Sequence, residues 1–373
     1  MHLTIKSADL AKITLRIQGA LLEKSLSHIS LKAANERLEV SAADRIVAIY
    51  TSSSASVTEE GVAFVPAKIF SDVVRELPKT NIALKAEGSF LLIRAQSASE
   101  FVMKVPLIED LSWKEAGSFE PSAESAKIPA TKLSYLLEQV LFCVSKDSSR
   151  NYGTVGYLHK SGENNLRLVG SDGYRLSYCN IQQATPKDFL PKGVCLTKRS
   201  LGEILRLCAE EAEYIELSHS DTTLKAAVDD YQVYMLLSAI KYPAYQSVLP
   251  KKMPKTACVS RLDFQSTARR ILLAADKRRA LQLKFTTEGL ALRSKTQGVT
   301  EGRENIALKE YNGSNCKLAV HGKYLTDIFS NMVGSDVSIS FNTEDQPVMF
   351  MPQEEPAGCQ SRHILVPIRE ADS

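Results

Sequence analysis

The chain repeats itself, and this repetition restricts its fold more than any other feature of the sequence. Three segments beginning at Ile5, Ile128 and Val259 align without gaps, and each has a strand end, a polar break and a helix start. The apolar residues of these helices follow helical spacing and are Leu10, Ile13 and Ile17, then Leu133, Leu136 and Val140, then Phe264 and Ile271. The third copy has Thr267 between its apolar residues.

A second family of segments follows each of the first by roughly 60 residues and begins at Val65, Leu196 and Val320. Its members share a basic residue, an apolar one, a small one, an acid and an apolar pair. The sequence therefore predicts six half-domains paired into three domains, with boundaries at 1–120, 121–250 and 251–373.

Short runs of alternating apolar and polar residues separate these helices, as in Arg37–Ala42, Asn81–Ala86 and Val337–Phe341. Such alternation is typical of half-buried strands in antiparallel sheets, so we expect an α+β fold with one helix and several strands per half-domain. Candidate linkers are Gly117–Ser125 and Pro250–Lys255.

Composition excludes several classes of protein. The chain is 44% hydrophobic and 24% charged with a net charge of +3, which is ordinary globular composition and not that of a strongly basic protein. No run of about 18 uncharged apolar residues occurs, so we expect no membrane association and a cytoplasmic location. Seven scattered cysteines favour neither a disulfide framework nor a zinc site.

Motifs for catalysis are absent from the sequence. It has no phosphate-binding glycine run ending in Lys-Ser or Lys-Thr, no GxGxxG, no nucleophile elbow and no histidine pair at i, i+4. The acidic cluster Glu210-Glu-Ala-Glu213 is better explained as a solvated helix end than as a metal site. We therefore expect no catalytic residue, metal or cofactor.

Two segments, Val169–Ser177 and His363–Arg369, are not explained by composition. The first can be two strands joined by a Ser-Asp-Gly turn, and the second a closing edge strand with a proline. A diffuse active site around Asp172 and Arg175, on a hydrolase or transferase scaffold, is the enzymatic alternative.

Three motifs together resemble the bacterial DNA polymerase III beta subunit family, the replicative sliding clamps. They are Ser171-Asp-Gly-Tyr-Arg-Leu, Lys241-Tyr-Pro-Ala-Tyr-Gln-Ser-Val-Leu-Pro and Val366-Pro-Ile-Arg, with the Val65-Pro-Ala helix start in addition. The resemblance covers essentially the whole chain. It implies a head-to-tail homodimer in which six clamp domains form a ring around duplex DNA, with helices lining the hole and sheet outside.

The resemblance also implies roles for particular residues. Sequence-independent contacts with DNA phosphates are expected from Lys12, Arg16, Lys24, Lys68, Arg75, Lys132, Arg150, Tyr152, Lys198, Arg199, Arg206 and Lys323, and Arg269 and Arg270 also lie on a lining helix. An apolar pocket for partner peptides, with Arg175 and Arg369 on its rim, is expected from Gly173, Tyr174, Arg175, Leu176, Pro243, Val248, Pro347, Ile364, Val366, Pro367, Ile368 and Arg369. The dimer is expected to close through Phe101 and Met103 against Leu272 and Leu273, or one of these leucines packs in its own core.

Several positions depart from the family pattern. Tyr174 replaces a usual histidine, Ser247 stands where an arginine is common, the loop near Gly153–Val155 is one residue longer, and Glu370–Ser373 follow the terminal arginine. The implied function is processivity: the ring encloses DNA and tethers the polymerase III alpha subunit, the clamp loader and other clamp-motif peptides, with no bond made or broken. A monomeric peptide-binding module that has lost the ring is the non-enzymatic alternative.

Overall fold

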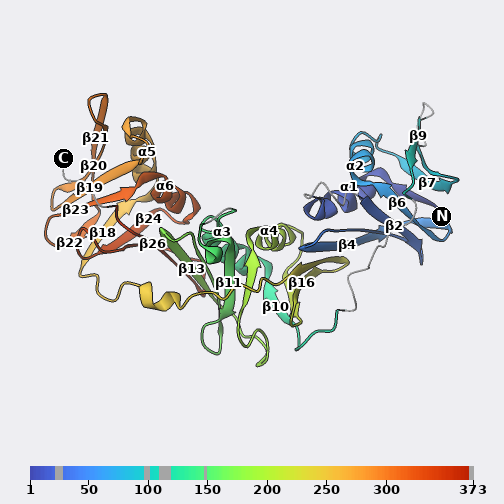
Figure 1. Ribbon diagram of the computed structural model, residues 1–373, viewed down its shortest axis with the longest axis horizontal. Coiled ribbons are helices and arrows are strands. Elements are labelled where there is room, and N and C mark those ends of the chain that lie inside the picture. Colours follow the sequence, from blue (N-terminus) through green and yellow to red (C-terminus); the bar gives the residue numbers. More distant parts are fainter. Residues whose placement is uncertain (22–27, 96–100, 109–118, 147–148, 369–373) are drawn as a thin grey trace. The chain divides into compact units, whose positions relative to one another are not determined.

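The computed structural model describes residues 1–21, 28–95, 101–108, 119–146 and 149–368, which form two compact units (Figure 1). Unit 1 comprises the described residues of Met1–Ala130, Pro186–Phe189 and Arg206–Leu237. Unit 2 comprises those of Thr131–Thr185, Leu190–Leu205 and Ser238–Ser373. The second of the three predicted repeats is thus divided between the two units, and the boundaries at 120 and 250 stay a prediction about the repeats.

Six α-helices occur in the described residues, and the sequence repeats predicted the position of each. The first family gives α1 (Ser7–Arg16), α3 (Ala130–Leu141) and α5 (Arg261–Ile271), and the second gives α2 (Ala67–Arg75), α4 (Lys198–Leu207) and α6 (Gly322–Asn331). The apolar residues predicted to face the core are all buried, and Thr267 is buried with its hydroxyl donating to Glu304 at 3.1 Å.

Unit 1 contains two antiparallel sheets. The five-stranded sheet has the order β5 (Ser56–Glu59), β1 (His2–Lys6), β7 (Asn81–Glu87), β8 (Phe90–Ala95) and β9 (Phe101–Pro106). The eight-stranded sheet has the order β10 (Ala126–Pro129), β15 (Tyr214–His219), β16 (Thr223–Val228), β17 (Tyr231–Leu236), β4 (Val47–Ser54), β3 (Arg37–Ala43), β2 (His28–Ala34) and β6 (Gly61–Pro66).

Unit 2 also contains two antiparallel sheets. The nine-stranded sheet has the order β14 (Val194–Thr197), β11 (Val155–Lys160), β12 (Asn165–Ser171), β13 (Arg175–Gln182), β26 (Cys359–Leu365), β25 (Val348–Pro352), β24 (Asp336–Phe341), β18 (Lys255–Ser260) and β22 (Glu310–Asn312). The four-stranded sheet has the order β21 (Thr300–Ile306), β20 (Gly289–Thr296), β19 (Ala280–Thr286) and β23 (Cys316–His321).

Each large sheet joins strands from two neighbouring repeats. In unit 1, β4 of the first repeat pairs with β17 of the second, and we call this strand pair the first junction. In unit 2, β13 of the second repeat pairs with β26 of the third, and we call this pair the second junction. The expectation that the C-terminal segment is an edge strand is therefore wrong, because β26 hydrogen-bonds to β13 on one side and to β25 on the other.

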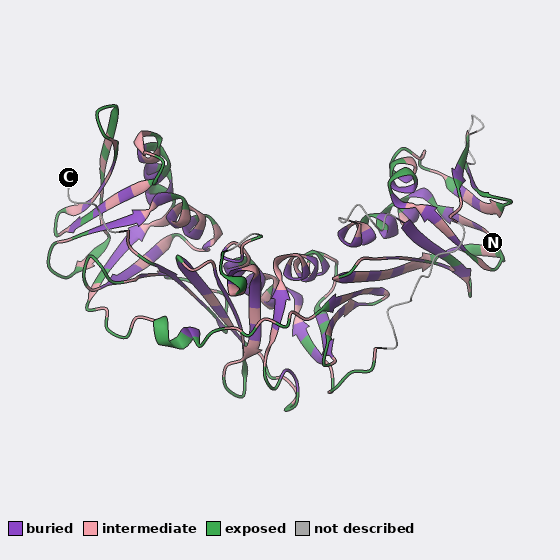
Figure 2. Ribbon diagram, viewed as in Figure 1, coloured by how far each residue is buried: buried purple, intermediate pink, exposed green. Residues whose placement is uncertain are grey.

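Helices cover one face of the sheets, and burial alternates along the strands (Figure 2). In unit 1, α1 and α2 pack on each other and α1 contacts β4; in unit 2, α5 and α6 pack on each other. Along β3, for example, Leu38, Val40 and Ala42 are fully buried, whereas the residues between them are not. These observations confirm the predicted α+β class with antiparallel sheets.

Candidate functional site

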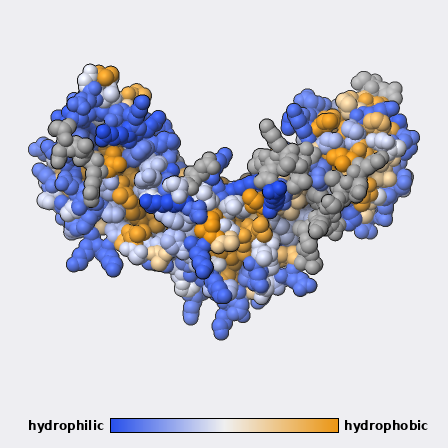
Figure 3. Space-filling model, in the orientation of Figure 1, coloured by the Kyte–Doolittle hydropathy of each residue, from blue (hydrophilic) through white to orange (hydrophobic). Residues whose placement is uncertain are grey.

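Three of the residues predicted to line the peptide pocket have exposed side chains near the second junction, and we call these three residues the apolar patch. Tyr174 in the turn between β12 and β13 is 59% exposed, Val248 is 61% exposed and Val366, directly after β26, is 47% exposed. The backbone N–H of Val366 donates to the Tyr174 carbonyl at 3.0 Å, which joins two of these segments directly. Figure 3 shows a mainly hydrophilic surface with separate apolar patches on the face in view.

A small cluster of buried side chains lies on the face of the sheet opposite the α-helices. It consists of Val169, Leu176, Tyr245 and Ile364, with Tyr157, Tyr178, Tyr242, Leu249 and Met349 packed against it. Leu176 and Ile364 are directly opposite each other in the β13–β26 ladder. Because side chains alternate across a strand, their neighbours Arg175, Ser177 and His363 face the opposite side, which carries the helices.

Aromatic rings hold the segment 241–250 on the same face. Tyr242 stacks on Tyr157 with centroids 5.3 Å apart, and the Tyr245 hydroxyl lies 3.0 Å from His159 Nε2. Arg167 also donates to the Tyr245 hydroxyl at 2.9 Å. Burial, and less strongly the charge of Arg167, lower the pKa of His159. The predicted wall residues Pro243 and Val248 are thus carried by an anchored segment.

Arg175 is not on the pocket rim, so that prediction is corrected. The residue is only 8% exposed, and its guanidinium donates to Asp172 Oδ2 at 2.9 Å, to Asp327 Oδ2 at 3.0 Å and to the Phe142 carbonyl at 3.1 Å. Asp327 lies on α6, 152 residues away in sequence, so this pairing could not be predicted from local sequence patterns. The two residues of the enzymatic alternative, Asp172 and Arg175, are therefore committed to structural ion pairs.

A column of three aromatic rings borders the patch, and two of them were missed by the sequence analysis. Tyr174 stacks on Tyr324 at 6.0 Å, and Tyr324 stacks on His321 at 4.2 Å. The Arg175 guanidinium lies 4.5 Å from the Tyr324 ring centroid. The helix start of the third repeat, His321-Gly-Lys-Tyr324, differs from that of the first repeat, Pro66-Ala-Lys-Ile69, in having two aromatic residues. This difference is the signal in the sequence that could have identified these rings.

The remaining predicted wall residues have mixed positions. Gly173 has φ +91°, and a Cβ there would lie 2.6 Å from Arg150, so the turn requires glycine. Pro347, Pro367 and Ile368 are half-buried, and Ile368 donates its N–H to the Ala319 carbonyl at 2.8 Å. Arg369 lies outside the described residues, as does Lys24 of the predicted DNA-contacting set.

Arg16 is withdrawn from the predicted DNA-contacting set, because its guanidinium is engaged at the first junction. It donates to the two Glu210 carboxylate oxygens at 3.1 and 2.8 Å and to the Thr51 hydroxyl at 3.0 Å. Asp230 lies 3.6 Å away, and the Tyr231 ring centroid lies 4.9 Å from the guanidinium carbon. The bond with Arg16 is the main reason that the pKa of Glu210 is lowered.

The other predicted cations belong to several different elements. Lys68 and Arg206 are exposed, and Arg199 is half-buried. Three other exposed cations form ion pairs: Lys12 with Glu210, Arg75 with Asp72, and Lys323 with Asp327. Lys132 donates a hydrogen bond to the Gln182 carbonyl, and Lys198 donates one to the Val144 carbonyl. Arg150 donates to the Tyr152 hydroxyl at 3.0 Å. Exposed lysine and arginine side chains on helices are suited to weak contacts with phosphates.

Two sheet edges carry the predicted dimer contacts. The β9 edge of the five-stranded sheet exposes Met103 and partly exposes Phe101. Near the β21 edge of the four-stranded sheet, Leu273 is 87% exposed, whereas Leu272 packs against the core of unit 2. One of the two leucines is therefore a core residue, as the alternative stated, and the other is free to meet a partner.

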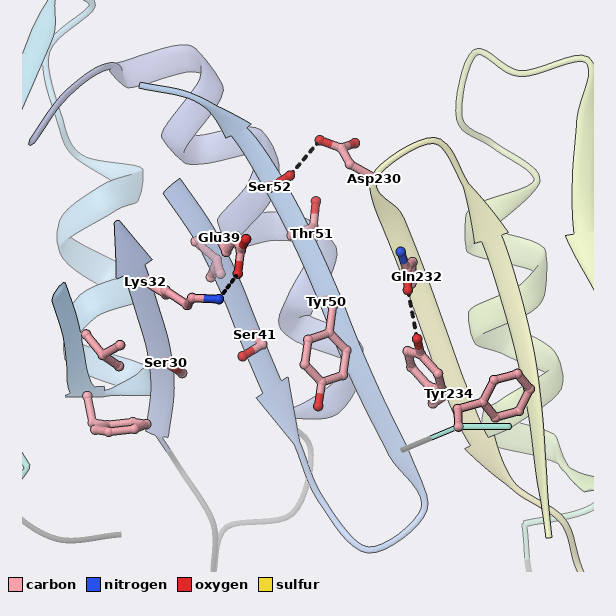
Figure 4. Close-up of a pocket in the computed structure, with 14 residues that line it drawn as sticks. Ser30, Lys32, Glu39, Ser41, Tyr50, Thr51, Ser52, Asp230, Gln232 and Tyr234 are labelled. Atoms are coloured by element: carbon pink, nitrogen blue, oxygen red, sulfur yellow. Dashed lines mark hydrogen bonds and ion pairs between the residues drawn. The ribbon is translucent and has the colours of Figure 1, made fainter. Parts of the chain in front are cut away.

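A larger groove lies on the helix-free face of the eight-stranded sheet (Figure 4). Its volume is about 810 Å³, and it is lined by side chains of β2, β3, β4, β6 and β17 together with Phe119. Ser30, Ser41 and Ser52 lie across its floor, and the Lys32–Glu39 ion pair of 3.1 Å borders one side. None of the predicted site residues lines this groove.

The described residues offer little for metal or redox chemistry. All seven cysteines are free thiols, and among the described residues no three His, Cys, Asp or Glu side chains are grouped so as to hold a metal ion. Within the same residues, no helix is both long and apolar enough to cross a membrane.

Comparisons with known proteins agree along the whole chain. Models of the DNA polymerase III beta subunit match in order: the N-terminal domain over residues 1–112, the central domain over 127–244 and the C-terminal domain over 246–368. The beta sliding clamp of Pseudomonas putida is 23% identical over 99% of this chain and 100% of that protein, and that of Synechocystis is 24% identical over 97% of each. Crystal structures of the beta subunits of Pseudomonas aeruginosa and Thermotoga maritima match with TM-scores of 0.90, at 21% and 20% identity, over 99% of this chain and 100% of theirs.

Proposed function

This chain belongs to the DNA polymerase III beta subunit family, and on that premise we propose that it is a sliding clamp that encircles duplex DNA and tethers its partners. One observation carries the proposal: three models of the same clamp subunit match consecutive parts of the chain, in order and nearly end to end. The protein is a processivity factor and catalyses no reaction itself.

The DNA contact is electrostatic and independent of base sequence. The net charge is only +3, so binding depends on the placement of exposed cations such as Lys12, Lys68 and Lys323 on the helices. Contacts of this kind to phosphates weaken steeply with salt, and they let a protein move along the duplex.

The apolar patch at the second junction is the tethering surface. Exposed Tyr174 and Val366 are joined by a backbone hydrogen bond, and exposed Val248 belongs to the segment that packs on a buried apolar cluster. Such a surface suits a short peptide with Leu and Phe side chains. Tethering raises the effective concentration of a polymerase at the primer end without any new catalytic group. The partners we propose are the polymerase III alpha subunit, a clamp loader and other proteins that carry such a peptide.

Ring closure is proposed through the edges β9 and β21 of two copies. An uncovered strand edge with apolar side chains invites association, and pairing of the two edges head to tail in a dimer removes both. Val102 and Met103 on β9 and Leu273 near β21 are exposed apolar residues at these edges.

The first experiment measures retention of the protein on nicked circular DNA, with a matching clamp loader and ATP, before and after the circle is cut. We expect retention on the circle and loss from the linear form, because a closed ring slides off a free end. Leu273→Asp is the matched variant, and we expect it to be monomeric by light scattering and not retained. Equal release of the wild type from both DNA forms would mean that the chain does not enclose DNA.

A second experiment tests the tethering surface separately. Deletion of Val366–Ser373 is expected to abolish stimulation of the polymerase while the dimer persists, because the deletion removes one wall of the patch and leaves β9 and β21 unchanged. Val366→Asp should have the same effect without shortening the chain. Normal stimulation by both variants contradicts the pocket assignment.

A further inference from the structure

A second, smaller pocket lies beside the tethering surface in unit 2. Its volume is about 360 Å³, and its lining includes Lys146, Lys198, Ser145, Ser149 and Tyr174. Tyr174 is thus shared, because it also belongs to the apolar patch and is more than half exposed. The pocket itself is polar, with two amines and two serine hydroxyls around it.

The positive charge of this pocket is not balanced. Arg175 and Asp172 also line it, and Asp172 together with Asp327 neutralises the Arg175 guanidinium, so the two lysines remain. Lys198 donates to the Val144 carbonyl at 2.6 Å, and neither Lys198 nor Lys146 forms an ion pair within the described part of the chain. Burial, followed by the charges of Arg175 and Lys146, lowers the pKa of Lys198. An anion in the pocket would relieve this repulsion between like charges.

The pocket also borders a loop predicted to meet DNA. Arg150 donates to the Gly173 carbonyl at 3.3 Å and to the Tyr152 hydroxyl at 3.0 Å. The pKa of Arg150 is raised mainly by Tyr152 and less strongly by Tyr174. A predicted DNA contact, Arg150, and a predicted peptide contact, Gly173, are therefore hydrogen-bonded to each other across two loops.

We propose that this pocket binds one phosphate of the DNA backbone through Lys146, Lys198 and the Tyr174 hydroxyl, and that the bound phosphate tightens peptide binding by fixing the Tyr174 ring. The proposal rests on the proposed function, since it presumes that the chain holds DNA and a peptide. A hydroxyl that donates to a phosphate restrains its ring. The peptide then meets an ordered wall and loses less conformational entropy on binding.

Thermodynamic linkage makes the proposed coupling between DNA and peptide reciprocal. If DNA tightens peptide binding by a given factor, the peptide tightens DNA binding by the same factor, and couplings of this kind are typically about fivefold or more. Tyr324 stacks on the other side of Tyr174 and keeps the ring near the position it must occupy.

The experiment measures the affinity of a labelled Leu- and Phe-containing peptide with and without a short linear duplex. For the wild type we expect about fivefold tighter peptide binding with duplex. Tyr174→Phe keeps the ring and removes the hydroxyl, and the ratio of the two affinities should fall to about one, whatever the affinity without DNA. Lys146→Ala with Lys198→Ala should also abolish the ratio and reduce the slope of log K for DNA against log salt by about one. Lys284→Ala, an exposed lysine on β19, is the charge-matched control and should keep the wild-type ratio.

Each other outcome has a definite meaning. If the wild type binds no duplex under any condition, the proposed function fails, whereas duplex binding with a ratio of one in the wild type overturns this inference alone. If the double lysine variant weakens peptide binding without DNA, the pocket holds an acidic group of the peptide and the inference is wrong. Inorganic phosphate alone, at millimolar concentration, must not reproduce the effect of duplex; if it does, the ligand is free phosphate and not the DNA backbone.

Discussion

At each of the two junctions, a largely buried arginine side chain links two neighbouring repeats. At the first junction Arg16 is held by Glu210 and Asp230 and lies over Tyr231; at the second, Arg175 is held by Asp172 and Asp327 and lies over Tyr324. In both cases a largely buried guanidinium joins elements of two neighbouring repeats. Each network also includes an exposed lysine of the proposed DNA-contacting set, Lys12 on Glu210 and Lys323 on Asp327, so the guanidinium and the exposed lysine share one acid at both junctions.

The two junctions differ on the face of the sheet that lies opposite the α-helices. Asp44 Oδ1 accepts from the N–H groups of Ile46 and Val47, as Asp172 Oδ1 does from those of Tyr174 and Arg175, so the two turns correspond. Aligned on these turns and their ladders, Ser41 corresponds to Val169 and Ser30 to Tyr157. At the first junction Ser30 and Ser41 leave an open groove between aromatic side chains, whereas at the second junction the corresponding Tyr157 and Val169 belong to the apolar cluster on which segment 241–250 packs.

The largest expected effect is on the second junction. Arg175→Ala leaves Asp172 without its partner in a largely buried site and leaves Asp327 with only the exposed Lys323, so we expect the free energy of unfolding to fall by about 3 kcal/mol. Urea denaturation followed by circular dichroism measures it. A loss below about 1 kcal/mol would show that the network contributes specificity and not stability.

A smaller loss of the free energy of unfolding is expected when the arginine of the first junction is removed. Arg16→Ala should cost about 2 kcal/mol, because Glu210 is closer to solvent than Asp172 and keeps Lys12 at 3.8 Å. Comparing Arg16→Ala, Glu210→Ala and the double variant by urea denaturation isolates the pair. Strict additivity of the two single losses would contradict a direct bond.

The anchoring of segment 241–250 can be tested by removing one atom. Tyr245→Phe keeps the ring and deletes the hydroxyl that His159 and Arg167 contact, with an expected cost of about 1 kcal/mol. Tyr50→Phe, on the groove of the first junction, is the matched control and should change stability less. Peptide affinity measured on both variants should fall only for Tyr245→Phe, since only that residue holds the pocket wall.

Acid should weaken unit 2 more than unit 1. The pKa of buried His363 is lowered to about 3, and the pKa values of His159 and His321 are also lowered, chiefly by burial, whereas His28 is the one histidine of unit 1 with this shift among the described residues. The unfolded chain takes up these protons near pH 6.5 and the folded chain only at lower pH, so stability is lost as pH falls below 6.5. We expect less than about 1 kcal/mol from His363 at pH 6.

Hydrogen exchange at pH 7 and pH 6, corrected for intrinsic rates and resolved by peptide, compares the two units directly. His363→Phe should reduce the acid loss in unit 2 if the variant folds, and His159→Phe provides an independent check. Equal acid loss in both units would contradict the assignment to these histidines.

The helices and most strands could be predicted from the sequence because they depend on the local spacing of apolar residues, and this spacing recurs in each repeat. It could not place Arg175, since the residue that buries its charge, Asp327, is 152 positions away, nor Arg16, whose partner Glu210 is 194 positions away. Exposed Leu273 and core-packed Leu272 are adjacent in sequence and equally apolar, so only packing separates them. The column of rings formed by Tyr174, Tyr324 and His321 was missed because its members come from two segments about 150 residues apart.

The sharing of the second repeat between two units limits how such a gene can be rearranged. If the second repeat were cut out at its boundaries, it would contain β17 without β4 and β13 without β26, and so it would have two unpaired sheet edges. Each repeat can be recognised as a module in the sequence, but the second one expressed alone would leave both of its junction strands unpaired.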